Sequence, residues 1–183
     1  YQYHDLFREF LLYQCQTHFE RELRHGFKCT AGHVAEKYGQ QDTAVGLYAE
    51  TQSWDELSRL ICEAAETLLT QGRHQTLQKY ISLLPQEKPQ QWPWLFYWSG
   101  MSRLVFDPVA TRKDLEHAFR LFEQKNQDLT GVLLCCSAII ESYYCCGDNM
   151  APTISWGDRL QQLLQQHNGF PSPTITGKVL TNL

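Results

Sequence analysis

The spacing of apolar residues along the chain is that of amphipathic helices. From residue 4 to about residue 24, apolar side chains recur at steps of three and four, which places them on one stripe of a helix; they are Leu6, Phe7, Phe10, Leu11, Cys15 and Phe19. The basic residues that precede Gly26 predict that this helix ends there, because Lys, Arg and Gly favour helix C-termini. Strand-like alternation is nearly absent after residue 3, so the pattern predicts an all-α fold.

Further helices are predicted along the rest of the chain, with short connectors between them. They cover residues 27–38, 42–51, 54–71, 74–84, 93–106, 109–125, 128–146 and 153–167, and a last helix starts near 173. Gly39 and Gly72 are placed to close two of them, and Asp42 to cap a third. Pro93 suits a first helical turn, and Asp107–Pro108 breaks the helix that follows it.

The predicted helices come in pairs that recur roughly every 35–40 residues, the period of tetratricopeptide-like repeats. A compact bundle would have fewer and longer helices. The spacing therefore predicts a right-handed superhelical stack of helical hairpins, whose hollow side is suited to binding.

Composition narrows the class of protein. Of the 183 residues, 43% are apolar, enough to bury a core, and the formal charge of −4 does not favour nucleic acid or an anionic membrane surface as a partner. No apolar run approaches the roughly 20 residues of a membrane helix. The opening residues lack the features of a signal peptide and read as the junction of two domains within a longer protein. The seven Cys are therefore expected to be reduced thiols, and the location cytoplasmic.

The opening stretch also resembles a known family. Residues 3–11, YHDLFREFL, resemble the YHxLFREFL element of the MalT-like signalling ATPases, the LAL regulators of the STAND class. Shorter matches follow in the family's order: Ala35-Glu36-Lys37-Tyr38, Thr43-Ala44-Val45, Gln52-Ser53-Trp54, the run from Leu68 to Pro85, and Trp92-Pro93-Trp94-Leu95. Gln52 and Ser53 stand where the family usually has Gly and Asp, so the turn there is expected to differ in shape.

The resemblance implies a domain order and a set of partners. Residues 1–24 would end a winged-helix module and link it onward, and residues 25–183 would form a tetratricopeptide-like sensor domain. Tyr3, His4 and Phe7 would contact the other domains of the parent protein. ATP would be bound by the parent alone, because this chain has no G-x-x-x-x-G-K-[ST] phosphate loop. A LuxR-type DNA-binding module often ends such proteins, but none is legible here.

Metal and acid–base chemistry find little support in the sequence. Cys135-Cys136 and Cys145-Cys146 are adjacent pairs, whose sulfurs diverge by about 100° around a helix. Cys135 and Cys146 share a face but lie about 16 Å apart at 1.5 Å per residue, too far for one tetrahedral ion. Small buried apolar residues are the preferred interpretation, and a redox role depends on thiol pKa values that sequence does not give. No HExxH or G-x-S-x-G motif is present.

The aromatic stretch of residues 92–98 is the strongest candidate for binding. One interpretation makes it core, with Leu95, Trp98, Ser102 and Val105 packed against neighbouring helices. The other places its aromatic side chains in a concave groove, together with nearby Arg side chains and later aromatic residues. The candidate ligand-binding residues are Trp94, Tyr97, Trp98, Arg103, Arg112, Tyr143, Tyr144 and Trp156.

These features predict a regulatory domain that catalyses no reaction. It would bind an inducer or a protein partner, contact no nucleic acid or membrane itself, and carry no cofactor or metal; self-association is possible for the parent. The alternative is a tetratricopeptide-like scaffold that docks proteins and senses no small molecule. A third class, an α-helical enzyme, would require a cluster of titratable groups in one pocket.

Overall fold

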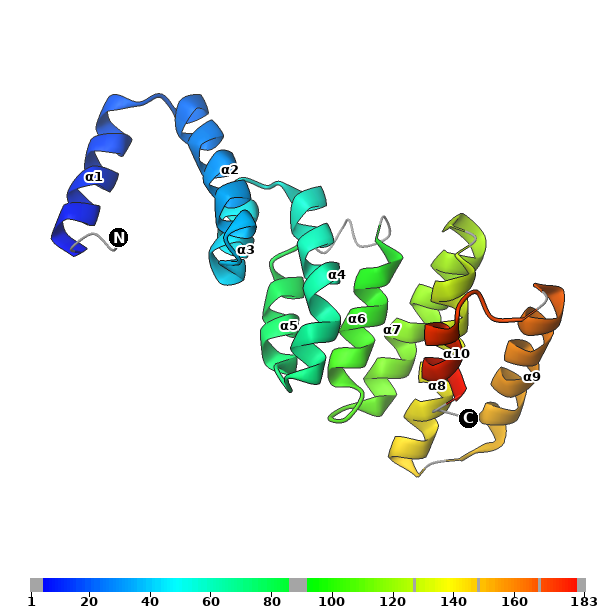
Figure 1. Ribbon diagram of the computed structural model, residues 1–183. Helices are drawn as coiled ribbons and strands as arrows, with labels where there is room; N and C mark the ends of the chain where they lie inside the picture. The colour runs from blue at the N-terminus through cyan, green and yellow to red at the C-terminus, as the bar shows by residue number, and fades with distance from the viewer. Residues whose placement is uncertain (1–4, 86–91, 127, 148, 168, 181–183) are drawn as a thin grey trace. The chain divides into compact units, whose positions relative to one another are not determined.

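The computed structural model describes residues 5–85, 92–126, 128–147, 149–167 and 169–180. Within these residues the chain forms ten α-helices and one π-helical turn, without any strand. The all-α prediction is therefore confirmed (Figure 1). Four helices that open successive pairs begin at Arg21, Trp54, Pro93 and Leu129, a recurrence of roughly 35 residues.

The chain divides into two compact units, one from Tyr1 to Leu60 and one from Ile61 to Leu183. The first holds α1 (Asp5–His18), α2 (Arg21–Lys37), α3 (Gln41–Glu50) and the start of α4 (Trp54–Thr70). The second holds the rest of α4, α5 (His74–Ser82), α6 (Pro93–Arg103), α7 (Pro108–Leu121), the π-helical turn η2 (Phe122–Asn126), α8 (Leu129–Cys146), α9 (Ala151–Gln166) and α10 (Pro173–Leu180). The sequence had suggested a division near residue 24.

The predicted helix over residues 4–24 is wrong, because the chain breaks it between α1 and α2. Glu20 has an extended backbone with ψ of 156°, and its carbonyl accepts the first hydrogen bond of α2 from the Arg24 N–H at 3.0 Å. Phe19 packs edge-on against Phe27 with ring centroids 5.4 Å apart, which fixes the corner. Gly26 lies inside α2 with open space around it and does not end a helix.

The first unit is held together by the contact of α2 with α3. Tyr48 on α3 is fully buried, and its hydroxyl donates to Glu36 Oε2 at 2.7 Å. Arg59 also donates to Glu36, at 2.7 Å, and both interactions hold the pKa of that carboxyl below its usual range, the Tyr48 hydrogen bond most strongly. The start of α3 differs from the prediction, because Gln40 precedes the helix and Asp42 lies in its first turn.

Helices α2, α3 and α4 end in the same type of turn, in which one residue has a positive φ. At Gly72 the backbone has φ of +71°, and the hydrogen bonds Gly72 N–H to Leu69 C=O and Arg73 N–H to Leu68 C=O form a Schellman motif. Gln52 ends α3 in the same way, with φ of 57°, although it has a side chain. Gln52 therefore adopts the left-handed backbone that favours glycine.

Gln52→Gly is expected to stabilise the first unit. A left-handed backbone costs a residue with a Cβ about 1–2 kcal/mol, and the greater freedom of an unfolded glycine returns part of that, so the net gain should be near 0.5–1 kcal/mol. Urea unfolding followed by circular dichroism measures it. Gly72→Ala serves as the reverse control and should destabilise, since it creates the same strain at φ of +71°. A loss of stability in Gln52→Gly would contradict the assignment of strain to this residue.

The second unit is built around α8. Residues 131–140 of this helix are buried without exception, and α8 contacts α7, α9, α10 and α6. Among the described residues it is the one helix long and apolar enough to cross a membrane, but 61% of it is buried within the fold and a core helix passes the same test. The sequence had not singled it out. Helix α6 begins at Pro93 as predicted, whereas α7 includes Pro108, which was predicted to lie in the break before it. The Asp107 carboxylate caps α7 by accepting from the Ala110 N–H at 3.0 Å.

Candidate functional site: a groove on the first helices of the second unit

Helix α6 lies between two cavities and contributes different side chains to each of them. Leu95, Ser99 and Arg103 follow each other at four-residue steps and therefore share one side. Tyr97 and Met101 lie on the opposite side, because 3.6 residues per turn places Leu95 and Tyr97 about 200° apart, whereas Trp98 lies about 60° from Leu95, between the two sides. Each side borders a separate cavity.

The first cavity is a groove formed by α4, α6 and α8, each the first helix of its pair, together with α10. We call it the first-helix groove, and its volume is about 260 Å³. Its lining combines apolar, aromatic and charged side chains: Glu66, Leu69, Thr70, Tyr97, Trp98, Met101, Leu134, Ser137, Ala138, Glu141 and Lys178. Because three successive pairs contribute to it, the groove depends on the pairing of helices and not on one loop.

The aromatic residues of the groove are held from behind by Trp94. The Trp94 ring stacks on Trp98 with centroids 6.3 Å apart and meets Tyr97 edge-on at 5.6 Å. On its other side Trp94 contacts Phe122, at 4.9 Å and 66° between ring planes. Tyr97 is 6% exposed, and Trp98 is half-buried. Trp94 thus connects the groove to the core, and Trp98 is the aromatic side chain more open to a ligand.

Charges in the groove come from two carboxylates and one amine. Lys178 Nζ on α10 lies 2.6 Å from Glu66 Oε1 on α4, an ion pair between partly exposed groups. Burial raises the pKa of Glu141, because an apolar environment disfavours its charged form. Burial also raises the pKa of Tyr97, so that its hydroxyl stays protonated at neutral pH. The groove therefore offers apolar contact, hydroxyl groups and the Glu66–Lys178 ion pair.

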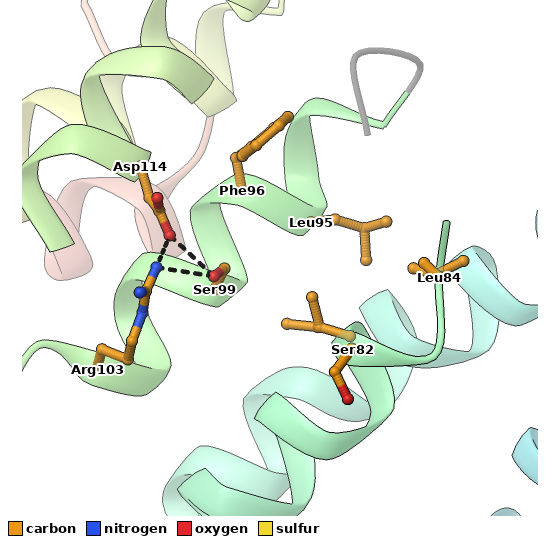
Figure 2. Close-up of a pocket in the computed structure, with 8 residues that line it drawn as sticks. Ser82, Leu84, Leu95, Phe96, Ser99, Arg103 and Asp114 are labelled. Carbon is orange, nitrogen blue, oxygen red and sulfur yellow. Dashed lines mark hydrogen bonds and ion pairs between the residues drawn. The ribbon is translucent and has the colours of Figure 1, made fainter. Parts of the chain in front are cut away.

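The second cavity lies on the other side of α6, against α5 and α7 (Figure 2). Its volume is about 290 Å³, and Leu84, Leu95 and Phe96 form its apolar wall. At its polar end the Asp114 carboxylate accepts from the Ser99 hydroxyl at 2.9 Å and is paired with the Arg103 guanidinium. Because Asp114 neutralises Arg103, this cavity offers a paired charge and not a free cation.

The predicted site residues are not all in one place. Tyr97 and Trp98 line the first-helix groove, with Trp94 behind them, whereas Arg103 lines the second cavity. The remaining four lie elsewhere and line neither cavity. The guanidinium carbon of Arg112 sits 4.1 Å from the Tyr143 ring centroid, and Trp156 packs edge-on against Phe119 at 5.2 Å. Tyr144 is 57% exposed.

Sequence reasoning missed the residues that α4, α8 and α10 contribute. Glu66 and Lys178 are 112 positions apart, so no local spacing links them. Leu134, Ala138 and Glu141 do recur at steps of four and three on one side of α8. That stripe could have indicated the side of α8 that faces the groove, but most residues around it are also apolar, so it did not stand out.

The predicted interdomain residues lie at the start of the chain. Tyr3 and His4 are outside the described residues, and Phe7 on α1 is 47% exposed, with its ring stacked on Phe10 at 6.4 Å. Within the first unit α1 exposes a series of large apolar side chains: Leu6, Phe7, Phe10, Leu11, Leu12 and Tyr13.

The cysteines behave as apolar residues where they are buried. Cys135 and Cys136 are fully buried in α8, as predicted, whereas Cys145 is exposed, which the prediction of a buried role did not anticipate. Burial raises the pKa of the Cys136 thiol to about 12, so at neutral pH it is protonated and a poor nucleophile. In the described part of the chain, no three His, Cys, Asp or Glu side chains come together as metal ligands would.

Two of the four positions predicted for the α6 core differ in the structure, because Trp98 is half-buried and lines the groove and Val105 is exposed. Leu95 and Ser102 are buried as the core interpretation required, but Val105 is 71% exposed, because α6 ends at Arg103. The core interpretation of the aromatic stretch therefore holds for Leu95 and Ser102, and the binding interpretation stays a prediction. Comparison with protein-family models, with curated proteins and with solved structures gives no match.

Proposed function

We propose that the chain is a regulatory helical-repeat module that recognises its ligand in the first-helix groove and catalyses no reaction. In this proposal its helical pairs form a right-handed superhelical stack of the tetratricopeptide kind. The observation that carries the proposal is the composition of the groove, which takes side chains from α4, α6 and α8, the first helices of three successive pairs. Grooves of this type bind extended peptides, helices or small ligands.

The parent protein in this proposal is a MalT-like signalling ATPase that regulates transcription in the cytoplasm. The support is the YHDLFREFL element of residues 3–11 and the shorter matches that follow it in order. The parent would supply ATP binding, while this chain would supply recognition of an inducer or a protein partner. The exposed apolar residues of α1, Phe7 among them, would contact the parent's neighbouring domains.

Regulation would follow from differential binding. A ligand shifts an equilibrium between two states of the parent only if it binds one of them more tightly. Because Trp94 contacts both Trp98 in the groove and Phe122 in the core, a ligand that repositions Trp98 acts on packed side chains of α6 and η2. Binding of a ligand in the groove would in this way alter the packing of helices in the second unit.

A thermal-shift screen with sugars, other metabolites and peptides tests the proposal. A ligand that binds the folded chain stabilises it by RT ln(1+[L]/Kd), about 2.7 kcal/mol at 100 times Kd. Trp98→Ala is expected to weaken any such ligand tenfold or more, as at other aromatic hot spots. Trp156→Ala is the matched control, because Trp156 packs on Phe119 outside the groove. Unchanged affinity in a folded Trp98→Ala chain would refute the groove as the binding site.

The second candidate function is a scaffold that docks protein partners only. The observation in its favour is that a helix of the chain itself, α10, contributes Lys178 to the groove. In the same screen a scaffold would be stabilised by peptides and by no metabolite, whereas a sensor would respond to a metabolite.

A further inference from the structure

Helix α10 packs mainly on α8 and little on α9, the helix that precedes it. Earlier in the second unit each second helix packs on the first helix of the next pair, α5 on α6 and α7 on α8. Helix α10 follows α9, but its principal neighbour is α8, where Figure 1 shows it in red beside the yellow helix. It therefore lies over the side of the unit where the first-helix groove is found.

The contacts of α10 resemble those of a bound ligand. Val179 is fully buried, and its carbonyl accepts from the Ser137 hydroxyl of α8 at 3.4 Å. The next residue back, Lys178, pairs with Glu66 of α4 at 2.6 Å. A helix of eight residues thus buries Val179 fully and Ile175 in part against the core cluster, and it directs one cation to a carboxylate of a different helix.

Without α10 the lining of the groove would contain two carboxyl groups and no basic residue. The charged residues that α4, α6 and α8 contribute to its lining are Glu66 and Glu141, and the single lysine belongs to α10. Tyr97, Trp98 and Met101 supply an apolar floor beside them. The complementary ligand is therefore a segment that offers a cation together with an aliphatic side chain.

We propose that α10 is an internal ligand of the first-helix groove, and that the external partner is a short amphipathic protein helix which replaces it. Such a helix would place a Lys or Arg beside Glu66 and an aliphatic residue in the position of Val179, a helix-in-groove mode of recognition. This inference rests on the proposed function, because both locate recognition in the same groove. Because α10 competes with the partner for the groove, only chains in which α10 is displaced can bind. The apparent Kd for the partner is therefore the intrinsic Kd divided by the fraction of such chains.

The test displaces α10 in the full chain and offers its sequence as a separate peptide. Val179→Asp places a charge in the buried position, and Leu180→Asp is the matched control, because the neighbouring Leu180 is 55% exposed. The probe is the capped peptide PTITGKVL, residues 173–180, titrated to millimolar concentration with the Trp98 indole N–H followed by NMR. Val179→Asp is expected to bind the peptide at least tenfold more tightly than the unmodified chain, and Leu180→Asp no more tightly than it.

Charge reversal gives a second route that does not disturb the buried position. Lys178→Glu should release α10 by repulsion from Glu66 and raise peptide affinity severalfold. Adding Glu66→Lys to Lys178→Glu should restore the internal contact and cancel the gain. In the Val179→Asp chain, Glu66→Lys should weaken the peptide PTITGKVL and favour one with Glu at the lysine position.

The outcomes separate this inference from the proposed function. Hydrogen exchange should rise in α10 of the Val179→Asp chain while α6 and α8 stay protected, which verifies that the groove is open in a folded unit. If an open groove binds the peptide no better than the Leu180→Asp control does, the internal-ligand proposal is overturned. The proposed function would survive that result if screened ligands still depended on Trp98. If Val179→Asp does not fold, the Lys178→Glu chain provides the test. Peptide affinity in Lys178→Glu no higher than in the unmodified chain would then overturn the inference.

Discussion

Phe122→Ala is expected to lower the free energy of unfolding of the second unit by about 3–5 kcal/mol, the range for a large aromatic side chain removed from a core. Phe122 is fully buried in the π-helical turn η2 and belongs to the core cluster that includes Leu133 and Val179. Its ring also supports Trp94, at 4.9 Å. The same substitution should therefore loosen the aromatic residues of the groove and weaken any ligand that depends on Trp98.

Urea unfolding followed by circular dichroism, with tryptophan fluorescence as a second probe, measures the effect. Phe106→Ala is the matched control, because Phe106 is 71% exposed and meets the His74 ring nearly at right angles, with ring centroids 5.5 Å apart. Its substitution should cost less than about 1 kcal/mol. A loss in Phe122→Ala as small as that in Phe106→Ala would mean that Phe122 does not anchor the core.

Gly131→Ala is expected to destabilise the same unit by about 1–3 kcal/mol through overpacking. A Cβ at Gly131 would lie 2.6 Å from Cγ and Cδ1 of Phe122 and 2.7 Å from Cδ2, closer than unbonded carbons approach. The ring lies across Gly131 and is itself fully buried, so it has no open side to move into. Glycine at this position thus lets η2 and α8 pack closely.

Gly157→Ala is the control for this effect. Gly157 lies inside α9 with nothing within 4 Å of the added methyl, so alanine there should stabilise by about 0.5–1 kcal/mol through its better helix propensity. Combining Gly131→Ala with Phe122→Leu should cost less than the sum of the two single changes, since the smaller side chain leaves room for the methyl. Additive losses, or a neutral Gly131→Ala, would show that the ring does not restrict this position.

Helix boundaries could be predicted wherever a single residue determines the backbone. Pro93 and Pro108 begin helices because they lack an N–H to donate, and Gly39 and Gly72 end helices because they adopt positive φ. The break at Phe19 and Glu20 has no such residue. It depends on the contact of Phe19 with Phe27, a tertiary interaction that the helix-period pattern cannot contain.

The candidate site could be predicted in part for a similar reason. The position of Tyr97 on the side of α6 opposite Leu95 follows from helix geometry, whereas Trp98 lies between these two sides and its place in the groove does not follow from it. The geometry of α6 does not tell which other helices pack on each of its sides. Glu66 and Lys178 therefore could not be added to the predicted binding residues, and Arg112 could not be excluded from them. The sequence also lacks any sign that α10 packs mainly on α8 and little on α9, because that preference depends on tertiary contacts.

The first-helix groove and the internal core belong to one packed arrangement. Trp94 contacts the groove residues Tyr97 and Trp98 on one side and the core residue Phe122 on the other. Substitutions in the core should therefore change ligand affinity, whereas substitutions at exposed positions such as Ile154, which is 69% exposed, should not. A core substitution that lowers the free energy of unfolding is therefore expected to lower ligand affinity in the groove as well.

Indole N–H signals of the chain's five tryptophans, followed by NMR during titration with a stabilising ligand from the thermal-shift screen, test the central claim most directly. If recognition takes place in the first-helix groove, the signal of Trp98 moves most, Trp94 behind it moves less, and those of Trp54 and Trp156 stay in place. A response centred on Trp54 or Trp156, with Trp98 unmoved at saturation, would contradict the account.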